Sequence, residues 1–324
     1  MTKKLNGVFE WLFFILLIAL SLILALGSGF SVAVLDGVKL WAACVLPSLF
    51  PYFLITTLLS SLNATAKFSS LLTPFTKRVF RCGGLVGYAF FMSLISGYPV
   101  GAKIVSDLKN KGFIAEKEAV RAACACSTSS PMFLISSVGS IMFGSTQLGL
   151  KLLLTHIISA ILIGFIFSFY GKDEKLSASS KFVPQKVDNL LYQSVYSSVL
   201  SVLVVGGLIT AFYLLTEVLL LTGALSPLIN LLSLVCEKQT ATAIVLSAFE
   251  CTKGLKCFSV ANLGFYTLPL CAATCGFGGI SVIAQSIAYL KNAKIKTVPF
   301  LLSKVVAAVI NFVIGLIIVL LFPL

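Results

Sequence analysis

Long apolar runs separated by short charged segments dominate the chain. The runs Trp11–Leu35, Leu40–Ala66 and Leu152–Tyr170 carry no formal charge, and each has the roughly 20 residues that a membrane-crossing helix needs. Pro47 and Pro51 lie within the second run and predict a kink there, because proline lacks the N–H that a helix interior uses. The pattern therefore predicts an all-α polytopic membrane protein.

The segments between these runs differ in character. Residues 67–81 combine four basic residues with phenylalanines, which is typical of an amphipathic helix lying on the membrane surface. Residues 103–121 form a charged connector. Residues 171–188 are hydrophilic and divide the chain nearly in half, so we interpret them as a loop between two related parts.

Two further apolar runs are interrupted in the middle. Leu94–Lys103 contains Gly97, Pro99 and Gly101, and a second run contains Cys126-Ser-Thr-Ser-Ser-Pro131. An unwound backbone inside a membrane is costly unless protein, water or a ligand satisfies its polar groups. In transporters such breaks often mark the substrate site.

The second half of the chain repeats this order of span, break, second break and final span. Val45–Thr56 shares several positions with Val199–Thr210, Gly101 falls opposite Gly254, and Cys126 falls opposite Cys275, all at nearly one spacing. Single identities mean little in an apolar sequence, but the shared order favours an inverted-repeat transporter core. It predicts re-entrant hairpins at 94–103 and 247–257 and broken transmembrane helices at 126–131 and 275–279.

The predicted organisation has four parts. They are an N-terminal transmembrane helix at 1–36, a first Gate-like inverted repeat at 37–170, a cytoplasmic loop at 171–188 and a second Gate-like inverted repeat at 189–324. With hairpins that do not cross and a cytoplasmic N-terminus, most of the 24 Lys and Arg residues fall on the inner side. That distribution follows the positive-inside rule.

Composition excludes several classes of protein. With 58% hydrophobic and 11% charged residues, the chain is far too apolar for a soluble domain. The net charge of +13 lies in short clusters typical of cytoplasmic loops, so we expect no nucleic-acid partner. We interpret the nine cysteines as reduced packing residues, because one histidine leaves a zinc site few ligands.

Enzyme motifs are missing from the sequence. It has no Walker A sequence, HExxH, GxSxG or paired catalytic carboxylates. We therefore expect no catalytic residue, no metal and no cofactor, and a protein that is not an enzyme. Transport would then draw on an ion gradient, on the substrate's own gradient, or on consumption of the substrate.

The four breaks form the predicted binding site. Half-helix N-termini present unpaired N–H groups and a positive dipole end, which attract anions such as carboxylates. The expected ligand is therefore a small anionic solute. The candidate substrate-binding residues are Ser96, Gly97, Tyr98, Pro99, Gly101, Lys103, Ser127, Thr128, Ser129, Ser130, Glu250, Thr252, Lys253, Gly254, Gly276, Gly278, Gly279, Ser281 and Gln285.

The charged candidates have alternative interpretations. Lys103 either contacts the ligand or extends to the inner interface. Glu250 and Lys253, spaced i, i+3, form either a structural pair at the hairpin tip or a ligand or cation site. Glu217 is expected to cap a span at the outer interface. His156 is expected to pack or to hydrogen-bond rather than to relay protons.

The broken segments resemble a known family. Ser96-Gly-Tyr-Pro-Val-Gly-Ala-Lys103, the Ser-Ser-Pro131 that follows, Phe277-Gly-Gly-Ile-Ser-Val-Ile-Ala-Gln285 and Pro299-Phe-Leu-Leu-Ser303 resemble the YlbJ-type sporulation integral membrane proteins, also called SpoVV. The similarity runs from about residue 40 to the C-terminus. That family belongs to the Gate, or nucleoside-recognition, group, whose core is similar to concentrative nucleoside transporters.

The resemblance implies a role in endospore formation. It implies transport of dipicolinic acid from the mother cell across the outer forespore membrane, with Tyr98 stacking on the aromatic ring. Alternatives are a carrier for nucleosides or other solutes, or a membrane assembly protein that transports nothing. Each transport hypothesis implies a protein of the bacterial cell membrane. Each is also compatible with a coupling ion and with a homo-oligomer.

Overall fold

The structure is a computed structural model that describes residues 29–61, 64–171, 189–261 and 263–322, together with the isolated positions 18, 21 and 27. Every regular element in these ranges is helical. In chain order they are α2 Phe30–Leu40, η1 Trp41–Val45, α3 Leu46–Ser61, α4 Ala64–Val79, α5 Gly84–Ser96, α6 Val100–Asn110, α7 Glu116–Ala125, η2 Phe133–Met142, α8 Thr146–Phe167, α9 Leu190–Leu221, α10 Ser226–Leu232, α11 Lys238–Phe249, α12 Cys251–Val260, η3 Gly264–Tyr266, α13 Thr267–Phe277, α14 Gly279–Asn292 and α15 Val298–Leu321.

Several of these helices have the length and apolar composition needed to cross a membrane. Within the described residues there are five such spans, or six if the bent pair α4–α5 counts as one. The all-α polytopic membrane fold is thereby confirmed. The five spans are Phe30–Leu59, Thr146–Phe167, Leu190–Leu221, Gly264–Asn292 and Val298–Leu321.

The first described span differs from its predicted limits. The sequence placed one span's end at Leu35 and the next span's start at Leu40, but α2, η1 and α3 form one continuous helix through both positions. A single Asp and a single Lys did not interrupt it. The π-helical segment Trp41–Val45 lies directly before Pro47, and its wider turns accommodate a residue that cannot donate a backbone hydrogen bond. The N-terminal part of the predicted span 11–35 lies outside the described residues.

The predicted basic segment at residues 67–81 is largely helical. It forms most of α4, which meets α5 at an angle of 96°. The two helices approach closely because a Cβ on Gly84 would overlap Ser69 and Thr73, and one on Gly87 would lie 2.7 Å from Leu72. Its position on the membrane surface stays a prediction.

All four predicted breaks are present. They separate α5 from α6 at residues 97–99, α7 from η2 at 126–130, α11 from α12 at Glu250, and α13 from α14 at Gly278. Gly97 has φ of 79° and Gly278 has φ of 84°, a region that side-chain-bearing residues rarely adopt. The Tyr98–Pro99 peptide bond is cis.

The helices on either side of the first and third breaks are in close contact. A Cβ on Gly101 in α6 would lie 2.7 Å from the Cβ of Ser93 in α5. In the same way, a Cβ on Gly254 in α12 would overlap the Cβ of Ser247 in α11. The same serine–glycine contact therefore closes both helix pairs, at matching positions in the two halves of the chain.

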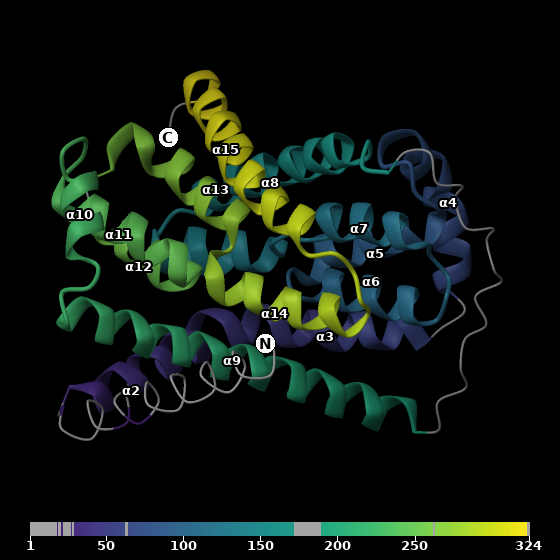
Figure 1. Ribbon diagram of the computed structural model, residues 1–324, viewed down its shortest axis with the longest axis horizontal. Helices are drawn as coiled ribbons and strands as arrows, with labels where there is room; N and C mark the ends of the chain where they lie inside the picture. Colours follow the sequence, from purple (N-terminus) through teal and green to yellow (C-terminus); the bar gives the residue numbers. More distant parts are fainter. Residues whose placement is uncertain are drawn as a thin grey trace, which may run out of the picture.

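The elements of the two halves are interleaved in space. Helices α2, α3 and α9 lie along one side of the molecule and α8, α13 and α15 along the other, with α6, α12 and α14 between them (Figure 1). One hydrophobic core joins both halves. Its members include Leu49, Leu134, Val205, Leu255 and Leu268. This arrangement brings the breaks to the middle of the molecule.

The close contact of α6 with α5 at Gly101 gives a testable prediction. A methyl group there would overlap the Cys126 carbonyl oxygen as well as approach Ser93, so Gly101→Ala is expected to destabilise the protein by about 3 kcal/mol, the upper end for overpacking. The measurement is the melting temperature of the purified protein in detergent. Gly207→Ala is the matched control, because its new methyl group meets nothing within 4 Å. Equal melting temperatures for Gly101→Ala and the unsubstituted protein would contradict this account.

Candidate functional site

The four breaks meet at a small central cavity. Its volume is about 30 Å³, which is close to the volume of one water molecule. Three breaks line it directly, and α14, which follows the fourth, contributes Gln285. The polar and thiol-bearing lining consists of Tyr98, Ser129, Ser130, Cys251, Thr252 and Gln285, with Gly97 beside them. In this conformation the cavity is too small for an organic solute.

A second, larger cavity adjoins it, and we call it the side cavity. Its volume is about 410 Å³, within the range of small-molecule sites. Pro99, Lys103, Asp107 and Lys111 line it from the first hairpin. Val205 and Gln285 line both cavities, so the side cavity lies next to the central one.

Tyr98 connects the first hairpin to the second. Its hydroxyl lies 3.8 Å from the Cys251 sulfur. The two residues stand at the same spacing as Gly101 and Gly254, so the hairpin tips touch at matching positions. The Tyr98 ring also reaches to 3.8 Å from where a Cβ on Gly278 would lie. Residues from three of the breaks therefore meet around one aromatic ring.

Each hairpin tip packs on the backbone of a broken helix. A Cβ on Gly97 would lie 2.9 Å from the Ser130 nitrogen. One on Gly279 would lie 3.0 Å from the Cys251 nitrogen and 3.1 Å from the Phe249 oxygen. These predicted glycines are thus explained by close backbone approach, which leaves no room for a side chain.

Side chains from the spans satisfy the polar backbone of the 126–130 break. The Ser129 N–H donates to His156 Nε2 at 2.7 Å, and Lys304 Nζ donates to the Ser127 oxygen at 3.3 Å. Thr128 Oγ1 donates to Ser93 Oγ at 3.1 Å. An accepting Nε2 places the imidazole proton on Nδ1. The hydrogen-bonding role expected for His156 is therefore confirmed.

Sequence reasoning missed Lys304 and Asn311 on α15. Lys304 is 1% exposed, and its Nζ lies 5.6 Å from the centre of the Tyr98 ring. Asn311 Nδ2 donates to Ser159 Oγ on α8 at 2.7 Å, and it packs where a Cβ on Gly276 would lie. The two residues are seven apart on one helix face. Polar residues inside an otherwise apolar span were the signal that could have found them.

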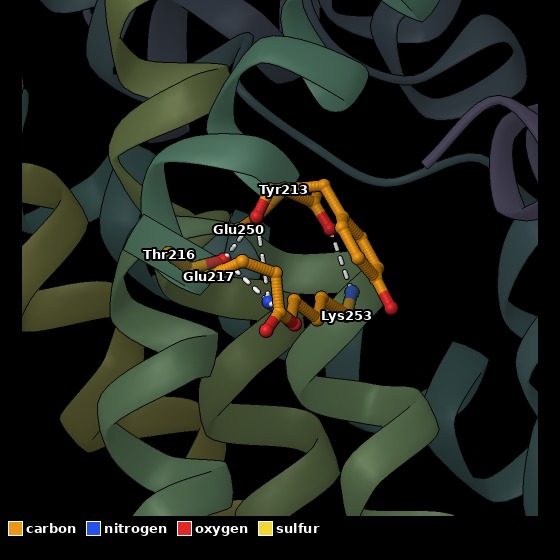
Figure 2. Close-up of polar contacts among 5 residues, drawn as sticks. All are labelled: Tyr213, Thr216, Glu217, Glu250 and Lys253. Atoms are coloured by element: carbon orange, nitrogen blue, oxygen red, sulfur yellow. Dashed lines mark hydrogen bonds and ion pairs between the residues drawn. The ribbon is translucent and has the colours of Figure 1, made fainter. Parts of the chain in front are cut away.

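Glu250 and Lys253 of the second hairpin contact each other, but their side chains do not form an ion pair with one another. The Glu250 carboxylate accepts from the Lys253 backbone N–H at 2.6 Å and caps α12, as acidic residues at helix N-termini do. The Lys253 ammonium instead contacts Glu217 Oε1 at 2.7 Å and Thr216 Oγ1 at 2.6 Å on α9 (Figure 2). It also lies 4.1 Å from the centre of the Tyr213 ring.

These contacts favour a structural role for the three charges. The Glu217 carboxylate is the counter-ion of Lys253 across two helices, and its expected place at the outer interface stays a prediction. The ammonium of Lys253 pairs with Glu217 rather than with Glu250. Sequence spacing suggested the i, i+3 partner, whereas the three-dimensional packing of α9 on α12 supplied a closer one.

The remaining candidates have structural partners or line the side cavity. Lys103 and Pro99 line that cavity rather than the central one. Ser96 Oγ is hydrogen-bonded to Thr56 Oγ1 and donates to the Tyr52 oxygen at 3.3 Å. Ser281 is an exception: it is fully buried on α14, and its hydroxyl has no hydrogen-bond partner among the described residues. Gln285 Nε2 is also buried but has no hydrogen-bond partner among the described residues.

Metal ligands do not gather at the site. Within the described part of the chain, no group of three or more His, Cys, Asp or Glu residues could hold a metal ion. The nine cysteines are all free.

Comparison with known proteins agrees with the motif-based resemblance. The chain is 28% identical over 299 residues to the "Sporulation integral membrane protein YlbJ" of Bacillus subtilis (strain 168), an alignment that covers 84% of this chain and 73% of the relative. No family model and no solved structure matches the chain. The expected resemblance to YlbJ-type membrane proteins is therefore confirmed.

The Lys253–Glu217 contact gives a second prediction. Glu217→Gln leaves a buried ammonium without a counter-ion and is expected to cost about 3 kcal/mol of unfolding free energy. Combining it with Lys253→Met should recover most of that loss. Denaturant titration of the purified protein measures both effects.

A matched control is available at the surface. Glu116 and Lys296 are also an ion pair, at 4.0 Å, but both side chains are well exposed, so Glu116→Gln is expected to cost less than about 1 kcal/mol. Equal losses for Glu116→Gln and Glu217→Gln would refute the assignment of Glu217 as a required counter-ion.

Proposed function

We propose, starting from the similarity to a YlbJ-type sporulation membrane protein, that this chain is a secondary transporter of a small anionic metabolite. The observation that carries the proposal is the meeting of the broken helices at one central cavity. A membrane protein with a purely structural role has no evident use for unwound backbone in its interior, where each freed polar group is costly. Broken helices around a central site are the arrangement by which many secondary transporters bind their substrates.

The helix termini at the breaks favour an anion. Helices α6, α12 and α14 each begin at a break, and helix N-termini carry partial positive charge. Glu250 already occupies the N-terminus of α12 and offsets its dipole. The N-termini of α6 and α14 have no acidic residue in their first turns, so they remain available to a carboxylate.

The matching contacts in the two halves support an inverted-repeat mechanism. The Ser93–Gly101 and Ser247–Gly254 contacts close the two hairpins in the same way, and Tyr98 meets Cys251 where the tips touch. Such a pair of repeats moves substrate when one half rocks against the other. In the topology proposed from the basic loops, the N-terminus is cytoplasmic and the side cavity opens toward the cytoplasm.

Dipicolinic acid is the proposed substrate, moved across the outer forespore membrane during sporulation. It is a flat aromatic dianion, and the side cavity of about 410 Å³ is large enough to admit it. Lys103 and Lys111 in that cavity would attract its carboxylates. Tyr98 offers an aromatic surface for its ring, and Gln285 offers an unpaired amide donor.

The test is uptake of dipicolinate into liposomes that contain the purified protein. We expect saturable uptake that empty liposomes lack. Gln285→Met should reduce it roughly tenfold, the effect of losing a hydrogen bond of about 1.5 kcal/mol to a charged group. Gln239→Met is the matched control, because Gln239 is exposed on α11 and donates only a long bond to the Val260 oxygen.

Other outcomes separate the alternatives. Uptake of uridine without uptake of dipicolinate would show a nucleoside carrier and contradict the proposed substrate. Folded protein that moves neither solute would contradict the transporter proposal and favour a role in membrane assembly.

A further inference from the structure

We infer that Lys304 supplies the positive charge that binds a carboxylate group of the substrate. The inference rests on the proposed transport of an anion and names the side chain at that site. Lys304 lies on α15 and is not among the binding residues predicted from the sequence. Neither Lys103 nor Lys253, the two basic candidates chosen from the sequence, has the same combination of burial and missing counter-ion.

The two buried lysines among the described residues differ in their partners. Lys253 is 3% exposed and has the Glu217 carboxylate at 2.7 Å and the Thr216 hydroxyl at 2.6 Å. Lys304 is 1% exposed, and no carboxylate among the described residues lies within ion-pair distance of it. Its hydrogen bond to the Ser127 oxygen is long, at 3.3 Å, and an ammonium group has three donors.

The groups that face Lys304 are neutral. Cys124 of α7 and Cys251 of α12 are near enough to interact with it electrostatically, as is His156 of α8. His156 accepts a hydrogen bond through Nε2, which requires the uncharged imidazole. A buried ammonium with such neighbours carries a desolvation penalty of several kcal/mol, which the long hydrogen bond to the Ser127 oxygen and the Tyr98 ring offset only in part. An arriving carboxylate would offset it.

Lys304 stands one side chain away from the central cavity. Its Nζ is 5.6 Å from the centre of the Tyr98 ring, and Tyr98 lines the cavity. The Ser127 oxygen that it contacts belongs to the same break as Ser129 and Ser130, which also line the cavity. Rotation of the Tyr98 ring would therefore open a direct path from the cavity to the ammonium.

One of the contacts of the Tyr98 hydroxyl is weak. Its hydroxyl meets the Cys251 sulfur at 3.8 Å, and thiols are poor hydrogen-bond partners. A flat aromatic carboxylate that displaces this contact would meet the Tyr98 ring and the Lys304 ammonium together. The geometry thus favours a carboxylate over a neutral solute at this place.

Lys103 has a different part in this scheme. It lies half-buried in the side cavity with Asp107 one turn further along α6, so its charge is partly balanced. It is suited to a first encounter with the anion. Lys291→Met is the matched control for Lys304→Met, because it removes a lysine that is exposed on α14 and lines neither cavity.

The experiment uses the whole chain. It measures how each ligand changes the melting temperature of the protein, and how fast each ligand enters liposomes that contain the protein. The probes are dipicolinate, its neutral diamide and benzoate. The unsubstituted protein is expected to be stabilised by both carboxylates. Lys304→Met should weaken carboxylate binding roughly 30-fold, the effect of removing one member of a buried charge pair, while leaving any binding of the diamide unchanged. Lys291→Met should change carboxylate binding less than about threefold, because an exposed charge outside the cavities contributes little.

Two further variants separate charge from folding. Lys304→Gln keeps an N–H donor for the Ser127 oxygen but removes the charge, so it should remain folded and lose carboxylate binding. Lys304→Arg keeps the charge and should retain part of the binding. Carboxylate binding by Lys304→Gln that equals that of the unsubstituted protein would overturn the inference.

The outcomes also distinguish this inference from the proposed substrate. If benzoate binds through Lys304 but dipicolinate neither binds nor moves, the inference holds and the substrate proposal fails. If dipicolinate moves equally well in Lys304→Gln, the transport proposal holds and the inference fails. Unsubstituted protein that responds to neither carboxylate overturns the inference as well.

Discussion

The structure depends on satisfying backbone groups that are freed inside a membrane protein. Wherever a helix is interrupted in such an interior, its N–H and C=O groups need partners that lipid does not provide. Here the partners come from other elements. His156 of α8 accepts a hydrogen bond from the Ser129 N–H, and Lys304 of α15 donates one to the Ser127 carbonyl oxygen. Glu250 accepts one from the Lys253 N–H. The contacts of His156 and Lys304 fix where the two uninterrupted spans α8 and α15 lie relative to the 126–130 break.

The structure also requires its helices and hairpin tips to approach one another closely, and glycine makes this possible. Gly97 and Gly279 sit where the hairpin tips press on the backbone of the broken helices, and Gly101 and Gly254 sit where the arms of each hairpin meet. The consequence is a central cavity of only about 30 Å³ beside a side cavity of about 410 Å³. A solute in the side cavity reaches the centre only if the tips separate. Contacts made by backbone and weak thiol groups, such as Tyr98 with Cys251, suit surfaces that part and rejoin.

The sequence predicted the interrupted helices and their order, because glycine and proline act locally on the backbone. It did not predict which side chains complete the breaks, because those partners lie on distant segments. Lys253 illustrates the difference: its nearest acidic residue in sequence is Glu250, yet its ammonium pairs with Glu217 on α9. The predicted interruption between Leu35 and Leu40 failed for the opposite reason. The charges of Asp36 and Lys39 suggested a loop between two spans, whereas the helix continues through both residues.

The contrast between the two buried lysines shows what the fold leaves open. If Lys304 served only to satisfy the Ser127 oxygen, a neutral donor would do so without the cost of burying a charge. Asn311, about two turns further along the same face of the helix, is such a donor and already links α15 to Ser159. The chain therefore uses a neutral residue where a structural hydrogen bond is needed and pairs Lys253 with a carboxylate where a charge is needed. Lys304 is neither a neutral donor nor paired with a carboxylate. It lies beside Tyr98 at the central cavity, where an anionic solute would supply the missing counter-ion.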